Sequence, residues 1–173
     1  MAVELGVHLG CEVVPEFGRI YCEAHGTDSS MADLLIIGQQ QAEMTRNARL
    51  RAVDWTILDT DPVTTAAWAQ MIFGRQHDWF LRFAEMADLY LLMEIDLPWV
   101  ADGLRLYAAP AEQRRFFDIC RNELERRNLN YALINGRGME RFHLAVSTIS
   151  TLSDNRSTVA KNVRDLKPIP HPF

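Results

Sequence analysis

Two hydrophobic periods run along the chain, and together they predict helices that alternate with short strands. Short runs of apolar and β-branched residues, ended by Gly, Pro or Asp, predict the strands. Longer segments with apolar residues three or four positions apart predict the helices. Strands are expected at 11–14, 53–58, 89–95 and 131–134, and helices at 2–9, 17–25, 30–52, 63–73, 77–86, 111–127 and 139–152. This alternation predicts an α/β fold with a doubly wound parallel sheet.

Capping signals mark the ends of several of these helices. Gly10 and Gly26 each follow one, at the position where glycine most often ends a helix. Ser30 is placed to cap the helix at 30–52, and Asp61 followed by Pro62 is typical of a helix start. The helix at 2–9 has no capping residue before it.

Composition and charge narrow the class of protein. With 173 residues, 48% of them apolar, the chain has the size of one globular domain. We expect that domain to span residues 1–153 and an irregular, proline-containing tail to span 154–173. The net charge of −5 argues against nucleic acid as a partner, because proteins that bind its backbone need excess Lys and Arg. No apolar run approaches the length of a membrane span and the first residues lack a secretory signal, so no membrane contact and a cytoplasmic location are expected.

Carboxylates follow the predicted strands. In an open α/β sheet, ligands bind beyond the carboxyl ends of the strands, and Glu16, Asp59 and Asp61 stand at such ends. A carboxylate there can hold Mg²⁺ or accept the proton of an attacking hydroxyl. Asp59 and Asp61 are two residues apart, so in an extended chain they would point the same way. The alternative is that Asp61 only caps a helix and Asp59 only forms a turn.

The segment 96–105 is the other unusual feature. It joins a large aromatic residue, Trp99, to Asp102 and Arg105 just after a predicted strand, where a lid over a substrate would lie. A surface loop held by packing of Trp99 is the alternative. In the helix 111–127, Arg121 with Glu125 and Glu123 with Arg127 are partners four positions apart, so the default prediction for its arginines is a solvated, ion-paired face. Arg105 and Arg114 are the exceptions that we regard as candidate phosphate contacts.

Several segments together resemble a known family. These segments are VPEFGRIY, GQQQAE, WTILDTDPVTT, LYLLMEIDLPWVADGLR and YALINGRGMERFHLAV. Their succession resembles the ribosylnicotinamide kinase domain of the NadR family, a P-loop nucleoside kinase fold, from about Met1 to Ile149. The pieces around Asp59 and from Asp96 to Arg105 are the most specific of them.

The resemblance implies a reaction and a set of site residues. The reaction is transfer of the γ-phosphate of ATP to the 5′-hydroxyl of nicotinamide riboside, or of a related nucleoside, with Mg²⁺ as cofactor. The small-molecule nucleoside and ATP would be the partners. Asp59 would accept the hydroxyl proton or hold Mg²⁺ through water, with Asp61 assisting. The other implied roles are Arg105 and Arg114 on the transferring phosphoryl group, Glu16, Arg19, Trp99 and Asp102 at the nucleoside, and Asn135, Arg137 and Arg141 beside the adenine.

The chain departs from this family at its start. The family begins with a strand and a Walker A loop, and Met1 would fall just after them. A P-loop sheet ordered 2-3-1-4-5 would then lack its central strand 1 and the cradle for the phosphates. Two explanations remain open: translation starts upstream of Met1, or the chain is a remnant that binds nucleotide or another protein without catalysis. We favour the first, because Asp59, Asp102 and Arg105 are present and truncation would leave a helix without a cap. A partner that supplies the strand is a third hypothesis.

Overall fold

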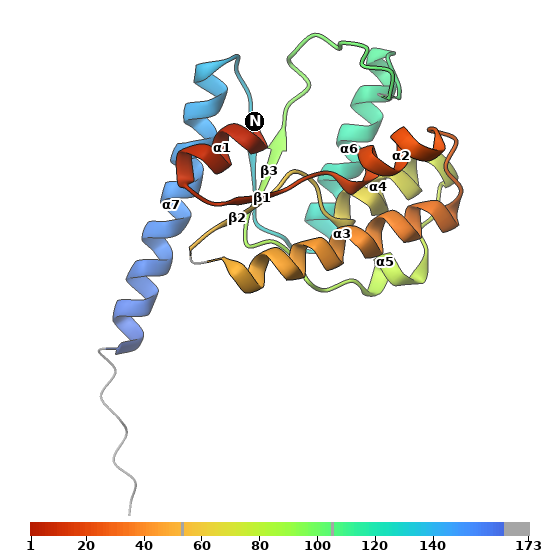
Figure 1. Ribbon diagram of the computed structural model, residues 1–173. Coiled ribbons are helices and arrows are strands. Elements are labelled where there is room, and N and C mark those ends of the chain that lie inside the picture. Colours follow the sequence, from red (N-terminus) through yellow and green to blue (C-terminus); the bar gives the residue numbers. More distant parts are fainter. Residues whose placement is uncertain (53, 105, 165–173) are drawn as a thin grey trace, which may run out of the picture.

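The computed structural model describes residues 1–52, 54–104 and 106–164, with side chains described up to residue 152. Eleven elements follow one another within these ranges (Figure 1). The helices are α1 (Ala2–Leu9), α2 (Phe17–His25), α3 (Met31–Arg51), α4 (Pro62–Phe73), α5 (Asp78–Arg82), α6 (Pro110–Arg126) and α7 (Met139–Arg164). The strands are β1 (Glu12–Val14), β2 (Thr56–Leu58), β3 (Tyr90–Met93) and β4 (Tyr131–Ile134). The predicted mixed α/β content is therefore confirmed.

All strand pairing in the described residues is parallel, but it forms two separate pairs. β1 pairs with β2, with Val14 opposite Leu58, and β3 pairs with β4, with Met93 opposite Ile134. Within the described ranges β2 and β3 do not pair with each other, so the expected single sheet is not formed there. Among the described strands, each of these two has a neighbour on one side only. The strand order 2-3-1-4-5 stays a prediction.

Two predicted helix boundaries were wrong. The helix expected at 77–86 ends at Arg82, because Phe83 is extended and the Arg127 guanidinium takes the carbonyls of Phe80 and Phe83. The helix expected to end at Leu152 continues to Arg164, so the tail expected to be irregular from Asp154 is helical over its first part. No Gly or Pro occurs between Gly138 and Pro168, and the helix therefore meets no residue that would end it. Residues 165–173 lie outside the described residues.

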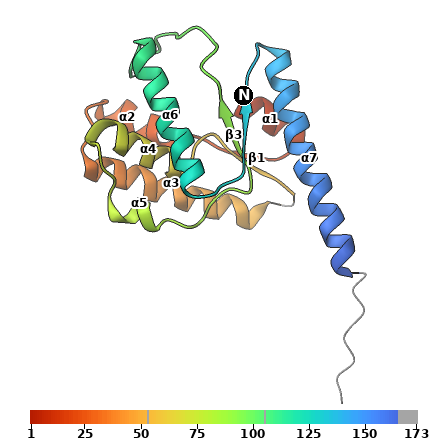
Figure 2. The same cartoon turned by 180° about the vertical axis from the view of Figure 1, so that it is seen from behind.

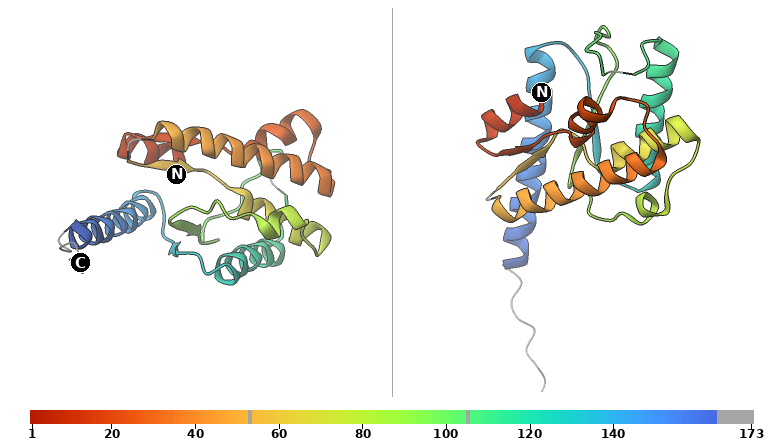
Figure 3. Two further views of the ribbon diagram at one scale, coloured as in Figure 1. Left: turned by 90° about the horizontal axis from the view of Figure 1, so that it is seen from below. Right: turned by 45° about the vertical axis from the view of Figure 1, so that its right-hand side comes forward.

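The helices form layers around the strands. Figure 3 shows from below that α4 lies between α3 and α6, and α4 packs against both of them. On the other side, α7 lies beside β4 and α1 packs on β1 and β2. Figure 2 shows from behind that α6 and α7 stand on either side of β3. No described helix is both long and apolar enough to cross a membrane.

Two apolar cores result from this arrangement. One holds Leu34, Ile37 and Phe80 between α3, α4 and α5, and the other holds Leu5 and Ile134 between α1, β4 and α7. In the first core, a Cβ added to Gly38 would lie 2.6 Å from the Phe80 ring, so only glycine lets α5 approach α3 this closely. The site described below lies beside this core.

The start of α3 has a capping box that makes stability depend on acid. Ser30 and Asp33 exchange the reciprocal hydrogen bonds of that motif, and the Tyr21 hydroxyl donates to Asp33 at 2.6 Å. Hydrogen bonds from Ser30 and then from Tyr21 lower the pKa of Asp33 to about 2. Because this pKa is depressed by folding, the Asp33 carboxylate stabilises the protein above its ordinary pKa, and that contribution is lost as the pH falls toward 2.

We predict that Asp33→Asn makes unfolding less sensitive to pH between about 4 and 2. Tyr21→Phe, which removes one of the hydrogen bonds to Asp33, should have part of the same effect. Glu43→Gln, on the same helix but without a side-chain hydrogen bond to a described residue, is the control. The midpoint of thermal unfolding, followed across this pH range, measures the effect. Equal pH slopes for Asp33→Asn and Glu43→Gln would show that the capping box does not carry the acid sensitivity.

Candidate functional site

A cavity of about 700 Å³ lies beyond the carboxyl ends of β1 and β2, and we call it the large cavity. α2, α4, α6 and the segment that joins β3 to α6 contribute to its wall. The polar residues that line it are Glu16, Arg19, Thr27, Ser29, Asp59, Thr60, Thr64, Thr65 and Gln113. Its aromatic residues are Trp68, Tyr90, Trp99, Tyr107, Phe116 and Phe117. Four of the predicted site residues, Glu16, Arg19, Asp59 and Trp99, therefore meet at one cavity.

Parallel pairing of β1 and β2 explains why two of these residues are neighbours. The strands end together at Val14 and Leu58, and the Asp59 N–H continues the ladder by donating to the Val14 carbonyl at 3.0 Å. Glu16 follows β1 by two residues and begins α2 without capping it through its side chain. Burial, and next the charge of Asp59, raise the pKa of Glu16, while Arg19 acts in the opposite direction. The site thus concentrates negative charge.

Asp59 is the most accessible carboxylate of this group. Its side chain is exposed and accepts no hydrogen bond from another described residue. Mg²⁺ keeps several of its waters and is held by one or two carboxylates together with substrate phosphates. Asp59, with Glu16 and the Thr60 hydroxyl beside it, fits that requirement. In the described residues no three His, Cys, Asp or Glu side chains form a group that could hold a metal ion by protein ligands alone.

Arg19 and Asp102 bind each other. The Arg19 guanidinium donates to the Asp102 carboxylate at 2.8 Å, and the two side chains are 42% and 31% exposed. This ion pair joins α2 to the segment between β3 and α6, which also carries Trp99 and Tyr107 into the wall of the large cavity. An ion pair this exposed contributes little to stability, but it holds the segment across the side of the cavity.

Aromatic residues that the sequence pattern did not single out line the cavity opposite the carboxylates. Trp68 of α4 stacks on Phe116 of α6 with 4.0 Å between ring centroids, and Tyr107 lies 5.9 Å from Trp68. Spacing along a helix predicts an apolar face, but spacing alone does not show which cavity such a face borders. Stacked rings of this kind offer a flat surface to a planar group.

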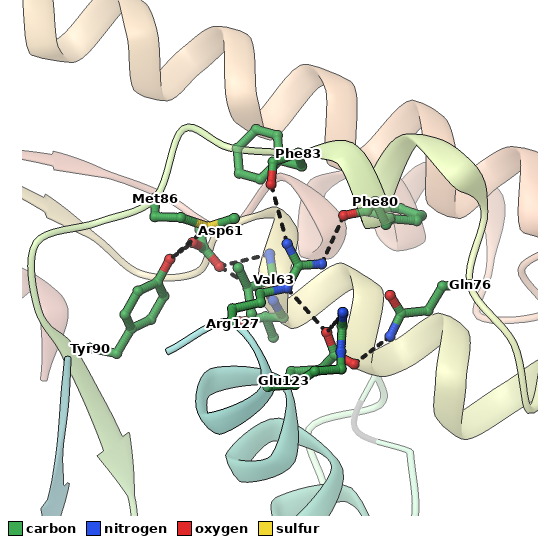
Figure 4. Close-up of polar contacts among 11 residues, drawn as sticks. Asp61, Val63, Gln76, Phe80, Phe83, Met86, Tyr90, Glu123 and Arg127 are labelled. Atoms are coloured by element: carbon green, nitrogen blue, oxygen red, sulfur yellow. Dashed lines mark hydrogen bonds and ion pairs between the residues drawn. The ribbon is translucent and has the colours of Figure 1, made fainter. Parts of the chain in front are cut away.

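Asp61 is placed differently from Asp59, and Figure 4 shows its surroundings. Its side chain is buried, accepts hydrogen bonds from the Val63 and Thr64 N–H groups, and accepts one from the Tyr90 hydroxyl at 2.6 Å. Burial raises the pKa of Asp61 against these hydrogen bonds. Asp61 is thus the N-cap of α4, and it does not line the large cavity. An assisting role in catalysis for Asp61 stays a prediction without geometric support.

The predicted phosphate and adenine contacts that fall within the described residues do not line the large cavity. Arg114 is half exposed and pairs with Glu94 at 3.3 Å. Arg141 is buried and binds Asp96 and the carbonyls of Glu94 and Gly136, so it ties the end of β3 to the turn after β4. Asn135 and Arg137 are exposed in that turn. Arg105 lies outside the described residues.

A second cavity, of about 520 Å³, lies between β2 and β3, and we call it the slot. Residues 56–61 line it without interruption, as do Tyr90 and Leu91 of β3. Because successive side chains of a strand point to opposite faces, a strand that lines a cavity with every residue borders it along its edge. The Thr56 hydroxyl, which lies there, is buried and has no hydrogen-bond partner among the described residues. Met1 also lines the slot, and Figure 2 shows the N-terminus close to β3.

Parallel strands between helices, with a cavity beyond the carboxyl ends of the strands, define the class of α/β proteins whose ligands bind at that edge. Comparison with known proteins agrees with that class. The model of the family AAA_28, described as AAA domain, matches residues 1–141. The chain therefore belongs to the AAA_28 family, and the family predicted from the sequence is confirmed.

Two curated relatives have the same name. The chain is 30% identical over 125 residues to the trifunctional NAD biosynthesis/regulator protein NadR of Escherichia coli (strain K12), which covers 69% of this chain and 30% of that protein. It is 30% identical over 124 residues to the NadR protein of Salmonella typhimurium (strain LT2), which covers 67% of this chain and 30% of that protein. The matched region thus spans about a third of the length of these relatives.

Proposed function

We propose that this domain, in the complete protein, phosphorylates the 5′-hydroxyl of nicotinamide riboside, or of a related nucleoside, with ATP as phosphate donor. The observation that carries the proposal is the large cavity, which brings Glu16, Arg19, Asp59 and Trp99 together beyond the ends of two parallel strands. The similarity to proteins named for NAD biosynthesis supports this class of nucleoside.

In this proposal Asp59 acts on the attacking hydroxyl. The hydroxyl oxygen forms a bond to the γ-phosphorus of ATP, the bond from that phosphorus to the bridging oxygen breaks, and ADP leaves. The hydroxyl proton passes to the Asp59 carboxylate. Mg²⁺, when bound, would neutralise charge that develops on the phosphates. Glu16 and Arg19 would hold the ribose, and Trp99 would lie against the base, where a cationic ring gains from contact with an indole face.

In the proposal, Arg114 has to leave Glu94 to reach the phosphates. Arg114 would exchange Glu94 for the transferring phosphoryl group, and Arg105 would join it from the lid segment. Such donors stabilise a loose transition state most effectively when they are fixed before the reaction. In the proposal, binding of ATP draws Arg114 away from Glu94.

The slot supports a further part of the proposal, namely that an additional strand lies between β2 and β3. Its two borders are strand edges whose N–H and C=O groups no described strand pairs. A parallel strand placed there would join the two pairs into one five-stranded sheet and would satisfy both edges. The turn after that strand would reach the start of α1, where backbone N–H groups can receive phosphate.

Intact mass and calorimetry of the protein isolated from its native source test the proposal. We expect a mass larger than 19.8 kDa by roughly 2 kDa, enough for a strand and a phosphate-binding loop. We expect this protein to bind nicotinamide riboside and ATP with Mg²⁺, and to form the 5′-mononucleotide. A chain of residues 1–173 alone, which lacks a Walker A loop, should bind ATP far more weakly.

Two results would overturn the proposal in different ways. If a protein that contains a Walker A loop takes up neither ligand, the site is not a nucleoside kinase site. If it binds ATP but never forms a phosphorylated nucleoside, the domain is a non-catalytic nucleotide-binding module, the alternative that the sequence left open.

A further inference from the structure

Gln41 is the most deeply buried polar side chain of α3. It is 1% exposed and lies on the same helix face as Ile37 and Thr45, which packs against the rest of the protein. A buried amide destabilises a protein unless its hydrogen-bonding groups find partners. The partners that Gln41 finds are in the short connection from β1 to α2.

The two ends of the Gln41 amide bind the residues on either side of Glu16. Its Oε1 accepts a hydrogen bond from the Phe17 N–H at 2.8 Å, and its Nε2 donates to the Pro15 carbonyl at 3.2 Å. No described strand pairs with the connection at these positions, so the Gln41 side chain of α3 fixes the backbone before and after Glu16.

This arrangement leaves the Glu16 carboxylate free. The first N–H groups of a helix have no partner within the helix, and the residue that precedes the helix commonly binds one of them with its own side chain. Glu16 precedes α2 but makes no such bond. Gln41 binds the first of these N–H groups, that of Phe17. The Glu16 side chain can then line the large cavity beside Asp59.

We propose that Gln41 is a positioning residue. By binding the backbone on both sides of Glu16, it keeps the Glu16 carboxylate in the large cavity, where that carboxylate binds a hydroxyl group of the nucleoside. The role of Gln41 in the connection rests on geometry alone, and its effect on the ligand rests on the proposed function. Without Gln41, the Phe17 N–H and the Pro15 carbonyl would lose their partner, and the backbone that carries Glu16 would no longer be fixed.

Gln41→Met is the variant that tests this, because methionine has a similar length but cannot make the hydrogen bonds to the Pro15 carbonyl and the Phe17 N–H. Ala42→Gly is the matched control, because it weakens the same buried part of α3 and leaves the bonds to Pro15 and Phe17 in place. Amide hydrogen exchange of the Phe17 N–H measures directly how firmly the connection from β1 to α2 is held. Under conditions in which the two variants have the same free energy of unfolding, we expect the Phe17 N–H to exchange at least ten times faster in Gln41→Met than in Ala42→Gly.

Calorimetry measures the effect of the variants on the affinity for nicotinamide riboside. It uses the protein with its complete chain. We expect Gln41→Met to weaken nucleoside binding about tenfold and to leave ATP binding within twofold. In a Glu16→Gln background the same change should have no further effect, because Gln41 acts through Glu16. Gln41→Glu keeps the acceptor for the Phe17 N–H and should restore part of the affinity.

The two measurements, hydrogen exchange and calorimetry, distinguish the failure of this inference from the failure of the proposed function. If Phe17 exchanges equally in Gln41→Met and Ala42→Gly, Gln41 does not hold the connection and the inference is wrong. If the losses of affinity in Gln41→Met and Glu16→Gln simply add, Gln41 does not act through Glu16, and the inference is again wrong. If the unaltered protein binds no nucleoside, the proposed function fails and so does the ligand part of the inference, while the exchange result still decides the role of Gln41 in the connection.

Discussion

Asp59→Asn, in the protein with its complete chain, is expected to lower kcat for phosphorylation of the nucleoside by about a thousandfold, the middle of the range for a lost general base. Asparagine has nearly the same shape but cannot take the hydroxyl proton. Because Asp59 is exposed and accepts no hydrogen bond from another described residue, the change should leave the stability of the fold within about 0.5 kcal/mol. Initial rates at saturating ATP and nucleoside, with urea unfolding in parallel, measure both effects.

Asp61→Asn is the matched control for Asp59→Asn. Asp61 is two residues further along, and its oxygens are already bound by the Tyr90 hydroxyl and the first N–H groups of α4. Asparagine is also a good N-cap, so Asp61→Asn should change kcat by less than threefold and act mainly on stability. A fall in kcat of less than tenfold for Asp59→Asn would show that Asp59 is not the general base. Equal falls in both variants would mean that the two carboxylates act together, as the sequence alone allowed.

Local signals explain why much of the fold could be predicted. Gly10, Ser30 and the pair Asp61 and Pro62 each act through their own neighbours, and α1, α3 and α4 begin and end within a residue or so of the predicted places. The pairing of strands depends on residues far apart in the chain, and no local signal encodes it. The described strands form two separate parallel pairs, which is what a sheet without its central strand would leave, while the order of the whole sheet stays a prediction.

The same distinction between local signals and contacts of distant residues holds for the candidate site. Glu16 and Asp59 could be predicted because the ends of parallel strands are where α/β proteins bind ligands, and the large cavity lies there. Gln41 could not, since a glutamine on a helix reads as a solvent-exposed residue until its distant partners Pro15 and Phe17 are known. Arg141 shows the opposite case, in which an arginine suited to bind a ligand is occupied by Asp96 and two carbonyls.

A distant contact also produces the largest expected loss of stability. Arg127, at the end of α6, is 8% exposed and pairs with Glu123 at 3.2 Å. It also donates to the carbonyls of Phe80 and Phe83, and so ends α5 (Figure 4). Arg127→Met should lower the free energy of unfolding by about 3 kcal/mol, the lower end of the range for breaking a buried ion pair. The value lies at that end because Glu123 keeps hydrogen bonds from Arg126 and Gln76.

Arg126→Met is the control that the chain itself offers. Arg126 binds the same carboxylate at 2.7 Å, but its side chain is 49% exposed, so its loss should lower the free energy of unfolding by only about 0.5 kcal/mol. Arg127→Lys should recover little of the stability, because an ammonium group lacks the planar array of donors that reaches one carboxylate and two carbonyls. Urea unfolding followed by tryptophan fluorescence measures all three variants. Similar losses in Arg126→Met and Arg127→Met would show that the contacts of Arg127 with Phe80 and Phe83 do not hold α5 and α6 together.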